Sequence, residues 1–98
     1  MGSGVQRTRC GSFYGTAANI DIRTVGFRPR KVELYNVDGL ATLIWTESMA
    51  DAAGVKRVTA GTMSIATAGV TPLSNGFRLG TDGDMNVAAE LVHYVAHE

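Results

Sequence analysis

Two histidines and a scatter of carboxylates are the residues of this chain that could do chemistry. His93 and His97 are four residues apart in a segment where apolar and polar residues alternate. Alternation with a period of two predicts a β-strand, which puts both imidazoles on one face about 13 Å apart. That separation is too large for one metal ion. We therefore interpret each histidine as a surface or interface residue.

Residues 82–86, Asp-Gly-Asp-Met-Asn, imitate the opening of a calcium loop, in which oxygen ligands occupy alternate positions. The match then fails, because Val87 stands where the sharp-turn glycine belongs and His93 stands where the bidentate glutamate belongs. We interpret the segment as a polar turn in which Asp and Asn bond their own backbone. The sequence predicts no metal site and no cofactor.

No pattern in the chain predicts catalysis. The glycine-rich stretch at 80–84 has no lysine after it and lies between expected strands, so it does not predict a phosphate loop. Asp21, Glu33 and Glu47 are separated acids that nothing in the expected strands brings together as a general acid and base. We expect no enzyme and no catalytic residue.

Length and composition predict a single domain over residues 1–98. Cys10, the only cysteine, excludes an intrachain disulfide, and we expect it to be a small buried apolar residue. No apolar run is long enough to span a bilayer and no signal peptide is evident, so we expect a soluble protein made in the cytoplasm.

The formal net charge is zero, but it is unevenly distributed along the chain. Residues 1–31 contain six basic residues and one acid, and residues 32–98 contain three basic residues and eight acids, so the two parts carry +5 and −5. The two parts could be complementary between neighbouring copies, or folding could intermix them. A neutral chain lacks the basic footprint of nucleic-acid binding, so we expect no direct nucleic-acid contact.

Glycines divide the chain into short segments rich in Val, Ile, Thr and aromatic residues, which is typical of strands. The sequence predicts an all-β domain: a compact antiparallel β-sandwich, jelly-roll-like, of about eight short strands, with residues 1–8 as a flexible N-terminal arm. The expected strands are residues 5–14, 18–23, 31–37, 40–47, 55–59, 62–67, 76–79 and 90–97.

The best-specified element is a hairpin over residues 31–45. Asp38-Gly39 is a strong signal for a two-residue turn with both residues at positive φ. This turn sets Leu34 opposite Leu43 and Val32 opposite Trp45, with all four side chains on one face. Glu33, Tyr35 and Thr42 then share the other face with Ile44. The predicted core contains these residues: Phe27, Val32, Leu34, Leu43, Trp45, Phe77, Leu79 and Tyr94.

The last segment is apolar on both of its faces, with Leu91, His93 and Val95 on one and Val92, Tyr94 and Ala96 on the other. Such a strand is either central in the fold or covered by a partner on one side. The same two alternatives hold for Ile44.

Several phrases together resemble small structural proteins of tailed bacteriophage virions. They are the run from Gly26 to Asn36, which begins Gly-Phe-Arg-Pro, then Trp45, Gly69-Val70-Thr71, the run from Gly76 to Asp82, Asn86, and the closing run from Val92 to Ala96. The resemblance covers roughly residue 25 to the C-terminus. The strand layout is also similar to that of the H-type lectin sandwich, which has a Phe-x-x-Pro entry and a late aromatic strand.

The resemblance implies a capsid decoration (cement) protein, because the chain offers a compact domain and an arm but no stalk of the kind a fibre requires. Such a protein binds the outer surface of the head, where it contacts the major capsid protein as a homo-oligomer, a trimer by analogy. We expect Arg7, Arg9, Arg28 and Arg30 to contact that partner. The alternatives are a receptor- or carbohydrate-binding tail-tip module, with Trp45, Tyr35 and Tyr14 as its platform, and a tail or connector protein.

Overall fold

The protein consists of eight antiparallel strands, seen in a computed structural model that describes residues 7–58, 61 and 63–98. No helix occurs among these residues. The all-β prediction is therefore confirmed, and each expected strand has a counterpart. The strands are β1 (Thr8–Tyr14), β2 (Ile20–Ile22), β3 (Lys31–Asn36), β4 (Ala41–Thr46), β5 (Ala53–Arg57), β6 (Met63–Leu73), β7 (Gly76–Leu79) and β8 (Leu91–His97).

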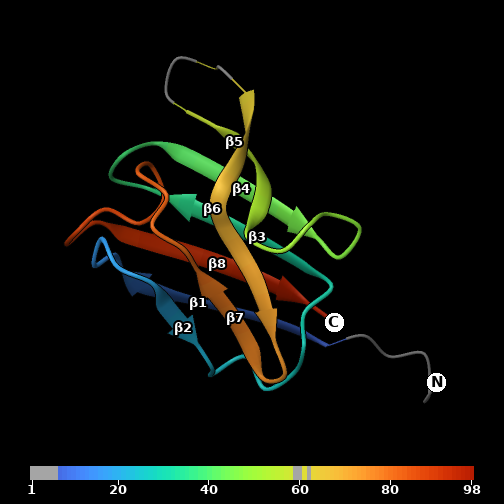
Figure 1. Cartoon of the computed structure of the whole chain (residues 1–98). Coiled ribbons are helices and arrows are strands. Elements are labelled where there is room, and N and C mark those ends of the chain that lie inside the picture. Colours follow the sequence, from blue (N-terminus) through green and yellow to red (C-terminus); the bar gives the residue numbers. More distant parts are fainter. Residues whose placement is uncertain (1–6, 59–60, 62) are drawn as a thin grey trace.

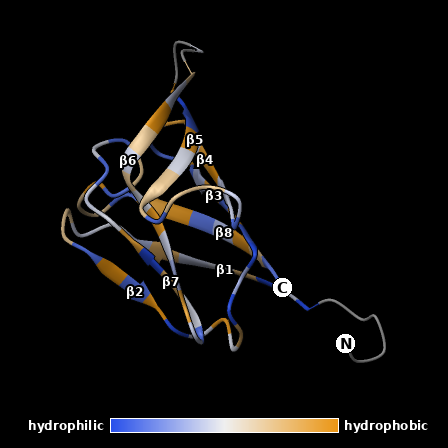
Figure 2. Ribbon diagram, turned by 45° about the vertical axis from the view of Figure 1, so that its right-hand side comes forward, coloured by the Kyte–Doolittle hydropathy of each residue, from blue (hydrophilic) through white to orange (hydrophobic). Residues whose placement is uncertain are grey.

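The eight strands form one sheet in the order β1-β8-β3-β4-β5-β6-β7-β2. The sheet curls, so that β7, β2 and the second part of β6 face β1, β8 and β3 across the core (Figures 1 and 2). The prediction was a compact, jelly-roll-like sandwich, whereas here one continuous curled sheet supplies both layers. The reason lies in β6, which was expected to end at residue 67 but continues to Leu73 and so belongs to both layers.

The curl is made where β5 meets β6. Val55 pairs with Ile65, but Ala53 pairs with Val70, so β6 carries extra residues at this point. Gly69 donates its N–H to the carbonyl oxygen of Ala52 at 2.8 Å. A Cβ atom on Gly69 would lie 2.3 Å from the Ala53 carbonyl oxygen, closer than any side chain could come. The bulge and this glycine together let β6 turn the corner between the two layers.

The predicted register of the β3–β4 hairpin is confirmed: Leu34 pairs with Leu43 and Val32 with Trp45. The predicted turn is wrong. Positive φ occurs in this loop at Leu40 (φ 54°) and not at Asp38-Gly39. The Oδ1 atom of Asn36 accepts hydrogen bonds from the backbone N–H groups of Asp38 (3.1 Å) and Gly39 (2.9 Å), which favours a longer turn capped by this side chain.

The inner faces of the two layers meet in one apolar core. Each of the eight residues named above as core is at most 5% exposed. The Trp45 indole N–H donates to the carbonyl oxygen of Ala50 at 3.1 Å, so its polar atom is paired inside the fold. Phe77 of β7 meets Tyr94 of β8 edge-on, with ring centroids 5.4 Å apart. This ring pair joins the two layers directly.

Two expectations near the N-terminus are corrected. Cys10 is exposed and not buried, because its side chain alternates to the solvent side of β1 while Gly11 and Phe13 take the inner side. Arg7 and Thr8 were placed in a flexible arm, but the Arg7 carbonyl oxygen accepts a bond from the Glu98 N–H at 2.9 Å and Thr8 pairs with His97. The rest of the expected arm, residues 1–6, lies outside the described residues.

The fluorescence of Trp45 tests this packing. Because the indole is only 1% exposed, we expect emission at short wavelength and almost no quenching by iodide or acrylamide in the folded protein. Unfolding in guanidinium chloride should shift the emission to longer wavelength and expose it to both quenchers. Strong quenching of the folded protein would contradict the packing described here.

Candidate protein-binding surface

The solvent side of β1, β8, β3, β4, β5 and the first part of β6 forms one broad surface, which we call the outer face. The exposed large apolar side chains of the described residues gather on this face or in the β3–β4 loop at its margin. They are Tyr14, Val37, Leu40, Ile44, Met63 and Ile65. Ile65 is 68% exposed and Ile44 is 37% exposed, so water contacts a large part of each. Apolar side chains concentrated on one side of a small domain are typical of a surface that binds a protein.

The register aligns part of this apolar surface into a row across the sheet. Cys10 pairs with Val95, which pairs with Glu33. Glu33 in turn lies opposite Ile44, and Val55 joins Ile44 to Ile65. Directly paired side chains lie about 5 Å apart, so the row is continuous over six strands, with Glu33 as its one charged member.

A hydrogen-bonded polar cluster surrounds Glu33 in the middle of the outer face. The Tyr35 hydroxyl donates to Glu33 Oε1, and His97 Nε2 lies 3.0 Å from Glu33 Oε2. Lys31 Nζ lies 3.7 Å from the same oxygen. The bond from Tyr35 is the main reason that the pKa of Glu33 lies below its usual value, with help from His97 and Lys31 against partial burial. The same bond, together with burial, raises the pKa of Tyr35.

The sequence did not predict this cluster as a unit. Alternation places Glu33 and Tyr35 on one face of β3, and that much could be read locally. His97 joins them only because β8 pairs with β3 at Lys31, a contact between residues distant in the chain. His93 is exposed and lies opposite Tyr35 in the β3–β8 register, but it makes no side-chain bond to the cluster. The cluster keeps Glu33 ionised and held in place at the centre of an apolar surface.

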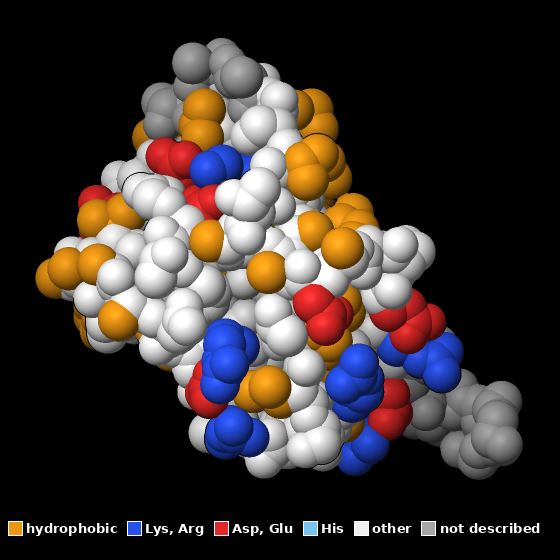
Figure 3. All heavy atoms as spheres, viewed as in Figure 1, with side chains coloured by type: hydrophobic (Ala, Val, Ile, Leu, Met, Phe, Trp, Pro, Cys, Tyr) orange, Lys and Arg blue, Asp and Glu red, His pale blue; other side chains and the backbone are white. Residues whose placement is uncertain are grey.

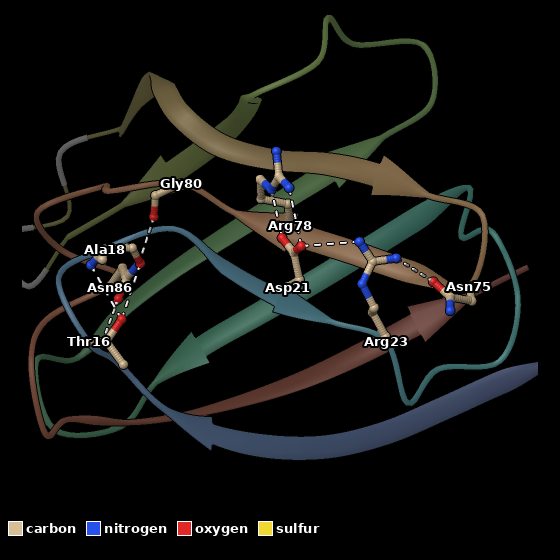
Figure 4. Close-up of polar contacts among 8 residues, drawn as sticks. All are labelled: Thr16, Ala18, Asp21, Arg23, Asn75, Arg78, Gly80 and Asn86. Atoms are coloured by element: carbon tan, nitrogen blue, oxygen red, sulfur yellow. Dashed lines mark hydrogen bonds and ion pairs between the residues drawn. The ribbon is translucent and has the colours of Figure 1, made fainter.

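The opposite side of the molecule is charged. Arg78 on β7 lies across from Asp21 on β2 and holds its carboxylate with two bonds, at 2.6 and 3.2 Å. Arg23 bonds the same carboxylate at 3.2 Å and also Asn75 Oδ1 at 3.2 Å (Figure 4). The bond from Arg78 is the largest cause of the lowered pKa of Asp21. Figure 3 shows basic and acidic side chains together where β7 and β2 lie.

The calcium-like segment is a polar turn in which Asp82 bonds the local backbone as predicted, whereas the Asn86 side chain bonds other loops instead. Asp82 Oδ1 accepts the N–H groups of Asp84 (2.9 Å) and Met85 (3.1 Å). The cation beside the two aspartates is Lys56, whose Nζ lies 3.0 Å from Asp82 and 2.8 Å from Asp84. Burial opposes the charged form of Lys56, but the bonds to Asp84 and Asp82 outweigh it and raise its pKa. Among the described residues no group of three His, Cys, Asp or Glu could hold a metal ion.

Asn86 joins the loop before β8 to the loop after β1. Its Oδ1 accepts the N–H groups of Thr16 (2.9 Å) and Ala17 (3.1 Å). Its Nδ2 donates to the carbonyl oxygens of Ala18 (2.6 Å) and Gly80 (2.8 Å), as Figure 4 shows. The side chain is 2% exposed, and these four bonds use all of its usual donors and acceptors. Asn86 therefore closes this end of the domain.

The fold itself explains the residues of the run from Gly76 to Asp82. A Cβ atom on Gly76 would lie 1.7 Å from the Ile22 carbonyl oxygen, so the close pairing of β7 with β2 requires glycine. Phe77 and Leu79 fill the core, while Arg78 between them faces outward to Asp21. Asp82 then caps the turn that leads to Asn86. These residues build the domain and carry no ligand-binding arrangement of their own.

The four arginines expected to contact a partner have different surroundings. Arg7 is held at its own domain, where the guanidinium bonds Glu98 and lies 5.1 Å from the Phe27 ring centroid. Arg30 lies 3.7 Å from Glu47. Arg9 and Arg28 are exposed, and neither forms an ion pair within the described part of the chain.

The uneven charge of the sequence is largely intermixed by folding. Arg7 and Arg30, from the basic first third, pair with Glu98 and Glu47 from the acidic remainder. Lys31 likewise faces Glu33. This outcome favours intermixing over a domain with one basic and one acidic pole.

No protein-family model, curated protein or solved structure matches this chain. The part of the chain that the structure describes contains no helix able to cross a membrane.

Replacing Asn86 by alanine should destabilise the domain strongly. The change leaves two N–H groups and two carbonyl oxygens without their partner, and we expect the free energy of unfolding to fall by roughly 2–4 kcal/mol. Urea titration followed by Trp45 emission measures the loss. Asn19→Ala, an exposed position in the same β1–β2 connection, is the control and should leave the midpoint almost unchanged. Equal midpoints for the two variants would contradict the role of Asn86.

The lowered pKa of Glu33 predicts a contribution to stability that depends on pH. A carboxylate with a depressed pKa in the folded state stabilises the fold above its unfolded pKa, about 4.3, and this stabilisation is lost as the pH falls further. Glu33→Gln should therefore reduce the acid-induced loss of stability between neutral pH and pH 3, measured by denaturant titration. Glu47→Gln, at an exposed position, is the control. An unchanged acid profile in Glu33→Gln would reject the assignment.

Proposed function

We propose that this domain is a protein-binding module of a tailed-phage virion, a decoration protein that binds the outside of the head and holds neighbouring major capsid subunits together. The observation that carries the proposal is the gathering of exposed apolar side chains on the outer face, with Ile44, Val55 and Ile65 paired across three strands. Burying such a row against another protein is favourable at roughly 25 cal/mol per Å².

The shape of this surface suits many weak contacts repeated by symmetry. It is a sheet face with side chains fixed by cross-strand pairing, so little conformational entropy is lost on binding. Each copy needs only a modest interface, because a lattice of capsid subunits supplies avidity. Arg28, which is exposed and has no ion-pair partner among the described residues, adds positive charge for acidic groups of the capsid.

The resemblance to phage virion proteins supports the choice of a capsid partner. Its phrases coincide with residues that shape the fold: Gly76, Phe77 and Asn86 build the β7–β2 pairing, the core and the loop closure. They therefore support a shared type of domain, while the outer face supports the binding role.

The alternative, a carbohydrate- or receptor-binding tail-tip module, loses most of its expected aromatic platform. Trp45 is 1% exposed, and the Tyr35 hydroxyl is occupied by Glu33. Tyr14, at 65% exposed, is the one member of the three whose ring is open to a sugar. A single tyrosine is a weak platform, so we favour protein binding.

Placing a charge on the outer face tests the proposal. Ile65→Glu should weaken binding to purified heads that lack this protein by about tenfold or more, because a carboxylate would replace an apolar contact. Binding is measured as occupancy against concentration in co-sedimentation with the heads. The melting temperature should change little, since Ile65 is exposed.

Ser74→Glu provides a matched control, since it introduces the same side chain at an exposed turn between β6 and β7 on the other layer. We expect this variant to bind heads like the wild type. Undiminished binding of Ile65→Glu, or equal weakening by Ser74→Glu, would reject the outer face as the contact surface. Failure of the wild-type protein to bind heads would reject the capsid as partner.

A further inference from the structure

Strand β1 forms one edge of the sheet, and its free side has no partner among the described residues. The Arg7 carbonyl oxygen accepts a bond from the Glu98 N–H, and the Gly15 N–H donates to the Glu90 carbonyl oxygen. Glu90 and Glu98 flank β8, so the backbone groups of Arg7 and Gly15 point toward that strand. Alternation along the strand therefore turns the backbone groups of Thr8, Cys10, Ser12 and Tyr14 away from β8. These four residues present eight backbone N–H and C=O groups along the edge that no other described residue bonds.

The two edges of the sheet differ in how they are protected. Edge strand β2 has only three residues and carries the Asp21 network beside it. β1 has seven residues in unbroken register with β8, without a proline or a bulge. Natural proteins usually shorten, bend, charge or cover an edge of this length, because it can pair with another strand. The open edge is therefore a site for strand addition.

We infer that the strand which adds to this edge is β1 of a second copy, antiparallel, across a two-fold axis at Gly11. In this register Cys10 lies opposite Ser12 of the second copy and Thr8 opposite Tyr14, so all eight free backbone groups are paired. At the two-fold axis, Gly11 of one copy lies opposite Gly11 of the other. The inference concerns self-association and does not depend on the proposed capsid role.

The side chains select this register. Arg9 is exposed and has no ion-pair partner among the described residues. In this register Arg9 lies opposite the half-buried ring of Phe13 in the second copy, and the two side chains form a cation–π contact. A shift of the axis to Cys10 would set Arg7 against that ring, but Arg7 is already held by Glu98 and Phe27. The two copies of Arg9 lie about 13 Å apart along the strands, so their repulsion is weak.

Pairing of this kind joins the two sheets and places their outer faces side by side. The apolar row that ends at Cys10 then continues, by symmetry, into the row of the second copy. Because the contact is isologous and uses up the edge of each copy, assembly stops at a dimer. This differs from the trimer that the phage resemblance implies.

An engineered disulfide tests both the contact and its register. In the Ser12→Cys variant, Cys10 of one copy lies opposite the new cysteine of the other in a hydrogen-bonded pair. The Cα atoms of such a pair are about 5.5 Å apart, which a disulfide can bridge. The wild-type Cys10 residues are diagonal neighbours about 7–8 Å apart, which is too far. Mild oxidation with glutathione should therefore convert most of Ser12→Cys to a covalent dimer on a non-reducing gel, but little of the wild type.

Three further variants complete the experiment. Cys10→Ser/Ser12→Cys keeps one thiol at the edge and should cross-link as poorly as the wild type. Ser12→Pro removes an N–H that points away from β8, so it should weaken dimerisation in sedimentation equilibrium by at least about tenfold while circular dichroism stays unchanged. Ser12→Ala should dimerise normally.

A monomeric or trimeric wild type would overturn the inference. So would cross-linking of the wild type as readily as Ser12→Cys. If Ser12→Pro fails to fold, the cross-linking comparison still decides, because it does not use that variant.

Discussion

One constraint governs this molecule: a single sheet has to bury its own inner face. The sheet must therefore curl into two layers, and contacts between the layers must hold them together. The corner is in β6, where the bulge opposite Ala53 and the close approach at Gly69 let one strand serve two layers. The closure has an apolar part and a polar part. Phe77 meets Tyr94 across the core, and Asn86 bonds the loops at the open end. With either part missing, the inner face would be left in contact with water.

The same constraint gives the surface its character. Because the inner side chains of every strand are needed for a small core, the contacts available to a partner are those of the outer sides. These are divided: the side of β2 and β7 carries ion pairs around Asp21, and the outer face carries apolar side chains around Glu33. Glu33, which is partly buried, is bonded by Tyr35 and His97, and these contacts fix the side chains in the middle of that face before a partner binds. A rigid apolar face suits binding more than chemistry.

Much of the fold could be predicted from the sequence because its signals are local. Alternation located the eight strands, and the spacing around Asp38-Gly39 fixed the register of Leu34 with Leu43. The turn itself was mispredicted, because the deciding contact is the Asn36 side chain, which also bonds Glu90 and the Asp84 carbonyl at the far side of the chain. Strand order, the length of β6 and the joining of the two layers depend on contacts between distant segments, which no local pattern encodes.

The candidate site was predictable only in part. Alternation along the strand placed the Ile44 side chain on the face that Trp45 does not use, which is the outer side. The alignment of Ile44 with Val55 and Ile65 could not be predicted, because it depends on the order of β4, β5 and β6 in the sheet. The exposure of Cys10 was missed because its face depends on where β1 lies in the sheet. Arg7 was expected at a partner, yet the nearby C-terminal Glu98 holds it.

The chain has four isoleucines, and the fold divides them evenly: Ile44 and Ile65 lie on the outer face, and Ile20 and Ile22 lie on β2 of the other layer. Ile20 and Ile22 alternate with the outward-facing Asp21, so their half-buried methyl groups report on the inner side of β2 and serve as the reference in the same NMR spectrum. On titration with purified heads, our account predicts that the methyl signals of Ile44 and Ile65 broaden first and most. Broadening that begins at Ile20 and Ile22 would contradict the outer face as the binding surface.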